Sequence, residues 1–271
     1  MNRIDDCFAR CRQQGRAALI PFITAGDPGP EHTVALMHAM VDAGADIIEL
    51  GIPFSDPMAD GPTIQLACER ALAAGMNLPR ALEIVREFRA GDSQTPVVLM
   101  GYLNPIEAMG ASRFAEAAKA AGADGVLSVD LAVEETDTLV PALRESGLAP
   151  IFLVAPTTSD KRIRDMDTAG QGYLYYVSLK GVTGSAALNV GAVSARLSAM
   201  RSLTDLPLAV GFGIREPRDA AAVAKDADAV IVGSALVEII AANAQDHEAM
   251  IAAIHRTVSA LSEAIAGART A

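Results

Sequence analysis

The chain has 271 residues, of which 51% are hydrophobic and 20% are charged, so it carries enough apolar material for a large core and too little charge for a disordered chain. Its net charge of −11 argues against nucleic acid or an anionic membrane as the main partner, although local backbone amides can still bind a phosphate on a small ligand. No apolar run reaches the length of a membrane span, and the first residues lack the apolar core of a signal peptide, so we expect a cytoplasmic protein.

Short apolar runs alternate with amphipathic, alanine-rich stretches along the whole chain. The apolar runs predict eight strands, at 18–22, 47–50, 97–100, 125–129, 151–154, 173–177, 208–210 and 229–232. The amphipathic stretches predict helices at 31–43, 78–89, 112–121, 134–146, 160–168, 192–201 and 217–224, with one more before the first strand and another from Asp246 into the C-terminal region.

Strands that are nearly all apolar and separated by helices are typical of a parallel sheet whose outer face is covered. Eight such units favour an α/β fold of the (β/α)8 (TIM) barrel type, with an extra N-terminal helix and short extra helices. A doubly wound open sheet is the alternative. No linker or low-complexity segment divides the chain, so we expect residues 1–271 to form one domain.

The segment 48–62 is the most informative part of the chain. A short buried strand is predicted around Glu49, which shares a strand face with Ile47. A carboxylate in such a strand is costly unless it has partners or a function. Three prolines and two further acids, Asp56 and Asp60, follow in a loop that continues neither strand nor helix. This arrangement can direct two carboxylates at one substrate.

Glycine-bearing loops follow the last three predicted strands, at 181–185, 211–213 and 233–235. Loops in these places of a (β/α)8 barrel often bind phosphate, because glycine lets the backbone approach the oxygens and a helix start offers free amides. Ser234 begins a helical segment and adds a hydroxyl. Each loop alone has the composition of an ordinary tight turn, but three on successive strand ends predict a phosphate site.

Cys7 and Cys11 lie four residues apart in the predicted N-terminal helix, which is half of a metal-binding pattern. No histidine or third cysteine lies near them in sequence, and the four histidines show no ligand spacing. We therefore expect partly buried, reduced thiols and no metal site. The sequence also shows no Ser-His-Asp arrangement.

With these segments in view, the chain resembles the tryptophan synthase alpha chain family. The shared motifs stand in the family's order and are LIPFITAGDP at 19–28, the run 49–62 with IQ at 64–65, GYLNP at 101–105, GVTG at 181–184, GFGI at 211–214 and VGSA at 232–235. The resemblance implies cleavage of indole-3-glycerol phosphate to indole and glyceraldehyde 3-phosphate, a retro-aldol lyase reaction without a cofactor in this chain. It also implies an alpha2beta2 heterotetramer with a pyridoxal-phosphate beta chain, which joins the indole to serine in L-tryptophan biosynthesis.

The resemblance further implies roles for single residues. Glu49 matches the family's general acid/base, in a reaction that protonates C3 of the indole and deprotonates a glycerol hydroxyl. Asp60 matches the acid that accepts a hydrogen bond from the indole N–H. The remaining matches are Phe22, Met100, Leu127, Tyr175, Thr183 and Phe212 around the substrate, Gly184, Gly213, Gly233 and Ser234 around the phosphate, and Pro53, Phe54, Asp56 and Asn104 in loops that meet the beta chain.

Two other functions fit parts of the sequence. A Schiff-base aldolase on the same fold needs a lysine at a strand end, and of the four lysines only Lys180 stands near one. A silent subunit that only activates a partner would keep the barrel and its loops, but the presence of Glu49 and Asp60 argues against it.

Overall fold

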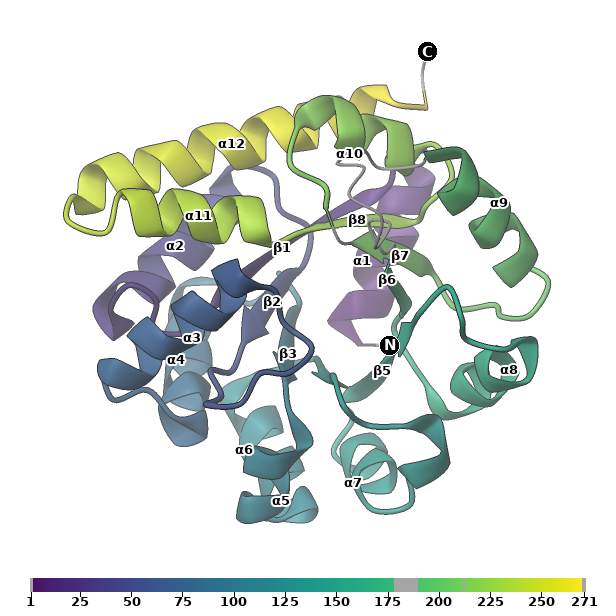
Figure 1. Cartoon of the computed structure of the whole chain (residues 1–271), viewed down its shortest axis with the longest axis horizontal. Coiled ribbons are helices and arrows are strands. Elements are labelled where there is room, and N and C mark those ends of the chain that lie inside the picture. Colours follow the sequence, from purple (N-terminus) through teal and green to yellow (C-terminus); the bar gives the residue numbers. More distant parts are fainter. Residues whose placement is uncertain (1, 178–189, 212, 270–271) are drawn as a thin grey trace.

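The computed structural model describes residues 2–177, 190–211 and 213–269. Its strands form a closed barrel in the order β1 to β8, in which every neighbouring pair is parallel and β1 pairs with β8 (Figure 1). Each predicted strand is present within two residues of its expected limits, and barrel closure excludes the open sheet. The strands are β1 (Ala18–Thr24), β2 (Ile48–Gly51), β3 (Val97–Gly101), β4 (Gly125–Ser128), β5 (Ala149–Val154), β6 (Leu174–Val177), β7 (Leu208–Gly211) and β8 (Ala229–Val232).

Helices alternate with the strands and cover the outside of the barrel (Figure 1). Eight of the nine predicted helices are present as single helices with ends close to those expected. The helices are α1 (Arg3–Gln13), α2 (Pro30–Asp42), α3 (Pro62–Ala73), α4 (Leu78–Gly91), α5 (Leu103–Met109), α6 (Ala111–Ala121), α7 (Leu139–Glu145), α8 (Asp160–Ala169), α9 (Val190–Met200), α10 (Pro217–Ala224), α11 (Ser234–Ala242) and α12 (His247–Gly267).

The helix predicted at 134–146 is wrong as one element. A short 3-10 turn, η1 (Val133–Glu135), is followed by a break and then by α7. Pro141 lies in the first turn of α7 and has no N–H, and its ring would clash with the carbonyl of residue 137 in a continuous helix. The helix therefore starts afresh just before the proline.

Alternate residues of β2 face two different cores. Ile48 and Leu50 point outward and join the large cluster between the barrel and its helices. Ile47 points inward and joins a second cluster inside the barrel, and Glu49 lies on that inner face, where it contacts Tyr173. The predicted face of Glu49 is therefore confirmed.

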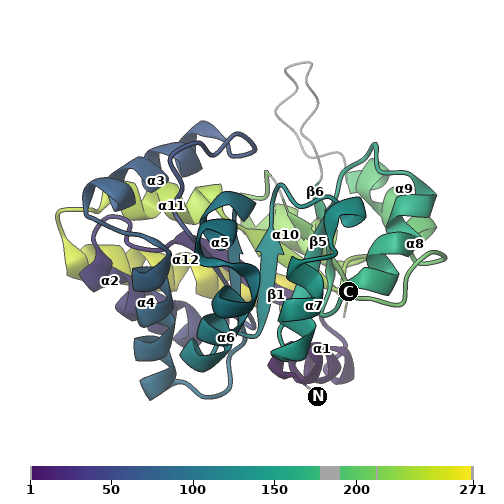
Figure 2. The ribbon, with the colours of Figure 1, turned by 90° about the horizontal axis from the view of Figure 1, so that it is seen from below.

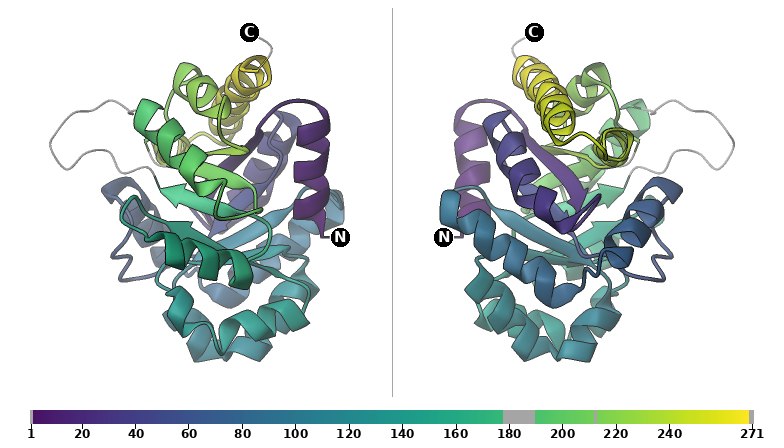
Figure 3. Two further views of the ribbon diagram at one scale, coloured as in Figure 1. Left: turned by 90° about the vertical axis from the view of Figure 1, so that its right-hand side faces the viewer. Right: turned by 90° about the vertical axis from the view of Figure 1, so that its left-hand side faces the viewer.

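The two ends of the barrel differ. At the end where the strands begin, α1 packs Ile4, Phe8 and both its cysteines against the inner cluster and closes the barrel from below (Figure 2). At the opposite end the loop between β2 and α3 lies above the barrel, next to α11 (Figure 2). On one side, α12 runs across α2, α10 and α11 (Figures 1 and 3).

Within the described part of the chain, no helix combines the length and the apolar character that crossing a bilayer requires.

Candidate active site

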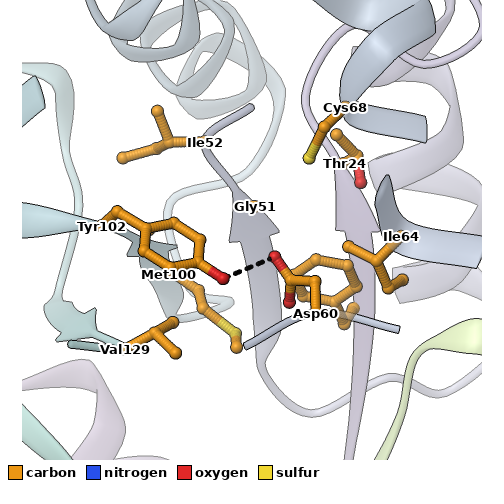
Figure 4. A pocket seen from close by; sticks show the side chains of 11 residues that line it. Thr24, Gly51, Ile52, Asp60, Ile64, Cys68, Met100, Tyr102 and Val129 are labelled. Atoms are coloured by element: carbon orange, nitrogen blue, oxygen red, sulfur yellow. Dashed lines mark hydrogen bonds between the residues drawn. The ribbon is translucent and has the colours of Figure 1, made fainter. Parts of the chain in front are cut away.

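A pocket opens at the carboxyl ends of β1 to β4, which is the end where (β/α)8 enzymes place their active sites (Figure 4). Gly51 makes room for it, because a Cβ atom at this position would lie 2.6 Å from the Phe22 ring. The residues that line the pocket come from these strands, from the loop after β2 and from α3; they are Phe22, Thr24, Gly51, Ile52, Asp60, Ile64, Cys68, Met100, Gly101, Tyr102 and Val129.

Glu49 lies two residues before Gly51 on β2 and has no exposed surface. The hydroxyl of Tyr173 donates a hydrogen bond of 2.5 Å to Glu49 Oε1. Burial raises the pKa of Glu49 to about 7, against a smaller, opposite effect of this hydrogen bond. A carboxyl group that titrates near neutral pH can both give and take a proton under one set of conditions, as a general acid/base must.

Two buried side-chain oxygens, both on β1 or β2, have no hydrogen-bond partner among the described residues. They are Glu49 Oε2 and Thr24 Oγ1, and Thr24, which lines the pocket, is 1% exposed. Leaving such a group unpaired costs about 1–3 kcal/mol. Unpaired buried groups are rare in folded proteins and mark places where a ligand or an ordered water completes a site.

Asp60 lies in the loop between β2 and α3 and turns its carboxylate into the pocket (Figure 4). The hydroxyl of Tyr102 donates a hydrogen bond of 3.0 Å to Asp60 Oδ2. The side chain of Gln65 holds the backbone carbonyl of Asp60 at 2.8 Å, one turn into α3. Burial raises the pKa of Asp60, and the Tyr102 hydroxyl lowers it.

The aromatic and aliphatic residues expected around the substrate divide into two groups. Phe22 and Met100 line the pocket, whereas Leu127 is fully buried inside the barrel and is not among the lining residues. Tyr175 is also in the barrel interior, where burial and the charges of Glu49 and Asp60 raise its pKa. It therefore lies within electrostatic reach of both carboxylates. Thr183 and Phe212 lie outside the described residues.

The predicted phosphate residues follow β7 and β8, which are neighbours in the barrel. Gly213 has a φ of +78°, which favours glycine, while Gly233 caps α11 and Ser234 is the first residue of that helix. The first turn of a helix presents amides without intrahelical partners and the positive end of the helix dipole, so α11 offers anion-binding groups here. Gly184 lies outside the described residues.

A polar bridge fixes the position of α11 relative to its neighbours. Glu238 of α11 pairs with Arg215 from the segment after β7, and it also accepts a hydrogen bond of 3.2 Å from Thr63 Oγ1 of α3. The first turn of α3, which follows the loop that carries Asp60, and the segment that carries Gly213 therefore contact the same residue of α11.

The residues expected at a partner interface lie on the outer side of the same loop and on α5. Asp56 and Asn104 are exposed, Phe54 is half-buried and Pro53 is buried.

Two large apolar side chains near these residues, Met58 and Leu66, were not predicted from the sequence and are 80% and 53% exposed. A shallow groove runs beside them, lined by Phe54, Ser55, Asp56, Pro57, Met58, Gln65, Glu69 and Leu72. Exposed apolar side chains beside a groove are typical of a protein interaction surface.

At the opposite end of the barrel, the fold brings Asp46 to Cys7 and Cys11, with donor atoms within 4.8 Å of one another. The expectation of partly buried thiols is wrong, because both cysteines are at most 1% exposed. Both Asp46 oxygens are already engaged, since Arg16 donates to each at 2.7 Å and the Leu19 N–H donates to Oδ2 at 2.9 Å. The guanidinium neutralises the carboxylate and opposes a cation, so the cluster serves to anchor α1 to β1 and β2.

Comparison with known proteins agrees with this geometry. The family model described as "Tryptophan synthase alpha chain" matches residues 8–266. The chain is 56% identical to the tryptophan synthase alpha chain of Alkalilimnicola ehrlichii, over 98% of this chain and 97% of that one. It is 60% identical to that of Methylococcus capsulatus, over 91% of this chain and 92% of that one. Among solved structures, tryptophan synthase subunit alpha from Legionella pneumophila superposes with a TM-score of 0.91 at 46% identity, covering 98% of each chain.

Proposed function

The chain belongs to the tryptophan synthase alpha chain family, and we propose that Glu49 and Asp60 carry out the family's reaction in it. The chain is accordingly a carbon–carbon lyase of tryptophan biosynthesis, which cleaves indole-3-glycerol phosphate to indole and glyceraldehyde 3-phosphate. The observation that carries the assignment of residues is the buried Glu49, with a pKa of about 7 and an unpaired Oε2, two residues before Gly51 of the pocket that Asp60 also lines.

The reaction needs two proton movements and one broken bond. Protonation of indole C3 makes the indole a leaving group, and the bond from C3 to the glycerol chain breaks as the adjacent hydroxyl loses its proton and becomes the aldehyde carbonyl. Glu49 serves as the group that moves these protons, because its carboxyl is poised between the two protonation states near neutral pH. Tyr173 holds Oε1 and so leaves Oε2 for the substrate.

Asp60 supports the indole during the same step. Positive charge develops on the indole nitrogen when C3 is protonated, and an ionised carboxylate that accepts the N–H hydrogen bond stabilises it. Phe22 and Met100 provide apolar surfaces for the ring in the same pocket. Leu127, Tyr175, Thr183 and Phe212 remain proposed substrate residues.

The phosphate end of the substrate is proposed to bind at Gly213, Gly233 and Ser234, together with Gly184. The start of α11 supports this choice, because it offers amides, a hydroxyl and the positive end of a dipole beside Phe22. A Cβ atom at Gly233 would lie 3.3 Å from the Phe22 ring, which shows how near this helix start is to the pocket.

The family implies a beta-chain partner. We propose that the chain forms an alpha2beta2 assembly in the cytoplasm and that it contacts the beta chain through Pro53, Phe54, Asp56 and Asn104. Pyridoxal phosphate would bind in the beta chain, and this chain would need no cofactor. The exposed Met58 and Leu66 beside the groove support a partner at this face.

A Schiff-base mechanism has little support in the described residues. Lys119, Lys161 and Lys225 are all exposed, on or beside outer helices, and none lines the pocket. Lys180 lies outside the described residues. Borohydride reduction in the presence of substrate is expected to leave no covalent adduct, and a trapped adduct would favour the aldolase.

The decisive assay for the function is indole release from indole-3-glycerol phosphate by the purified chain, with and without a tryptophan synthase beta chain. We expect turnover in both cases and faster turnover with the partner. An absence of turnover under both conditions would mean a silent subunit. Asp60→Asn should lose most of the activity because the neutral amide cannot stabilise the indole cation.

A further inference from the structure

Tyr102 holds the end of the catalytic loop through its hydroxyl. It follows β3, caps the start of α5 and is 4% exposed. Its hydroxyl donates to Asp60 Oδ2 at 3.0 Å (Figure 4). It also accepts a hydrogen bond of 3.1 Å from the Ala59 N–H. One hydroxyl thus orders two successive residues of the loop between β2 and α3.

The same side chain also holds the beginning of that loop. The rings of Phe54 and Tyr102 are stacked, with centroids 5.2 Å apart and planes inclined by 30°. Phe54 lines the exposed groove together with Asp56 and Met58. A contact made in the groove therefore reaches the Tyr102 ring through one aromatic pair.

The backbone at Tyr102 is itself well anchored. The N–H of Leu103 donates to Asp130 Oδ1 at 2.8 Å, and Ser128 at the end of β4 holds the same oxygen at 3.0 Å. Tyr102 is therefore held in place on the barrel, and the loop packs against it. A movement of the loop would change the hydrogen bond between Tyr102 and Asp60.

The hydroxyl also affects the charge of Asp60. Burial disfavours the ionised carboxylate and raises its pKa, whereas the Tyr102 hydrogen bond favours the ionised form and lowers the pKa. Among the described residues, Tyr102 is the only side chain that donates a hydrogen bond to this carboxylate.

We propose that Tyr102 is a positioning residue that keeps Asp60 ionised and aimed into the pocket, and that it transmits a protein partner's contact with the Phe54–Met58 face to Asp60. The proposal rests on the proposed role of Asp60 as the carboxylate that receives the indole N–H. The stacked rings of Phe54 and Tyr102 would then couple partner binding at the groove to the position of Asp60 in the pocket.

The test of the first part is Tyr102→Phe, which keeps the ring and removes the hydroxyl. We expect kcat/KM for indole release to fall about tenfold near neutral pH, the scale of one hydrogen bond to a charged group. The acidic limb of the pH profile should move to higher pH, because Asp60 then protonates more readily. Tyr176→Phe is the matched control: Tyr176 lies on β6 in the outer cluster, and its variant should behave as the wild type.

The test of the second part is Phe54→Leu, which removes the stack and leaves the hydroxyl. We expect a beta chain to accelerate indole release less in Phe54→Leu and in Tyr102→Phe than in the wild type. In the double variant, the loss of acceleration should be smaller than the sum of the two single losses, because both residues transmit the same contact. Additive losses would overturn the coupling. An unchanged pH profile in Tyr102→Phe, with Asp60→Asn inactive, would overturn the positioning role alone. An active Asp60→Asn would instead refute the proposed function on which it rests.

Discussion

Among the single residues, Glu49 is a carboxylic acid in a buried position, and burial disfavours its ionised form. Glu49 has no exposed surface, one short hydrogen bond from Tyr173 and a pKa raised by burial from 4.5 to about 7. Tyr173 is itself fully buried against Phe8 of α1, with ring centroids 5.9 Å apart. The partner of the acid is therefore fixed by the helix that closes the other end of the barrel.

This raised pKa has a consequence for stability. Between pH 4.5 and about 7 the unfolded chain has released the Glu49 proton, whereas the folded protein still binds it, so stability falls as the pH rises through this window. Glu49→Gln removes this titration. The variant's free energy of unfolding should therefore gain on that of the wild type as the pH rises, by on the order of 3 kcal/mol in total.

Urea unfolding of both proteins at about pH 5 and about pH 8 measures this gain. Glu116→Gln, on the exposed face of α6, is the control and should show no such growth with pH. A difference between Glu49→Gln and the wild type that stays constant across the range would mean that the carboxyl is not held neutral by burial.

The sequence located the acid but not its partners. The strand pattern pointed to Glu49 and the resemblance to Glu49, Asp60 and Tyr175, whereas the contact of Tyr173 with Glu49 was not predicted. Which of these two tyrosines reaches Glu49 depends on the stagger of β6 against β2 across the barrel, and no local pattern carries that information. Tyr102 was missed because its contact with Asp60 spans 42 residues.

At the scale of elements, the eight strands were predictable because apolar β-forming runs between helices are a strong local signal. The helices α3 and α5 were missed, although Pro62 at the first position of α3 is a common start signal. The proline-rich loop before α3 hid its start, and α5 has only seven residues and contains Pro105. The break before α7 was missed because helical periodicity continues on both sides of it.

Glycines of the strands shape the pocket, and Gly51 gives a direct test. A methyl group at this position would lie 2.6 Å from the Phe22 ring, which must then move within the pocket. Overpacking of this kind typically costs about 1–3 kcal/mol, so Gly51→Ala should raise KM for indole-3-glycerol phosphate about tenfold. Steady-state kinetics with a check of the fold by circular dichroism measure this.

Gly267→Ala is the matched control for that variant, because its added methyl group meets nothing within 4 Å at the end of α12. It should leave KM unchanged. A wild-type KM in Gly51→Ala, with the fold intact, would remove Phe22 from the substrate pocket.

At the scale of the whole molecule, the barrel predicted from the sequence is present, and its closure by β1 and β8 places distant segments side by side. We propose that residues 1–271 form a single domain. The packing of α12 against α2 supports this, since it joins the two ends of the sequence, as does the contact of α1 with the inner core.

A single domain predicts one cooperative unfolding transition. The chain contains no tryptophan and four tyrosines, of which one directly follows β3 and three lie at or in β6. Tyrosine fluorescence therefore reports on the surroundings of these two strands. Far-ultraviolet circular dichroism reports on all the helices. The two transitions in urea should coincide. Separate midpoints would show that part of the chain unfolds independently and would contradict the single domain.

Turnover by Glu49→Gln tests most directly whether Glu49 moves the protons of the lyase reaction. The amide keeps the shape of the side chain and can still accept the Tyr173 hydrogen bond, but it cannot relay a proton. We predict that kcat for indole formation falls at least ~10²-fold, with KM nearly unchanged and a melting temperature at or above that of the wild type. Near-normal kcat, or activity lost only through unfolding, would mean that Glu49 is a structural residue and does not move these protons.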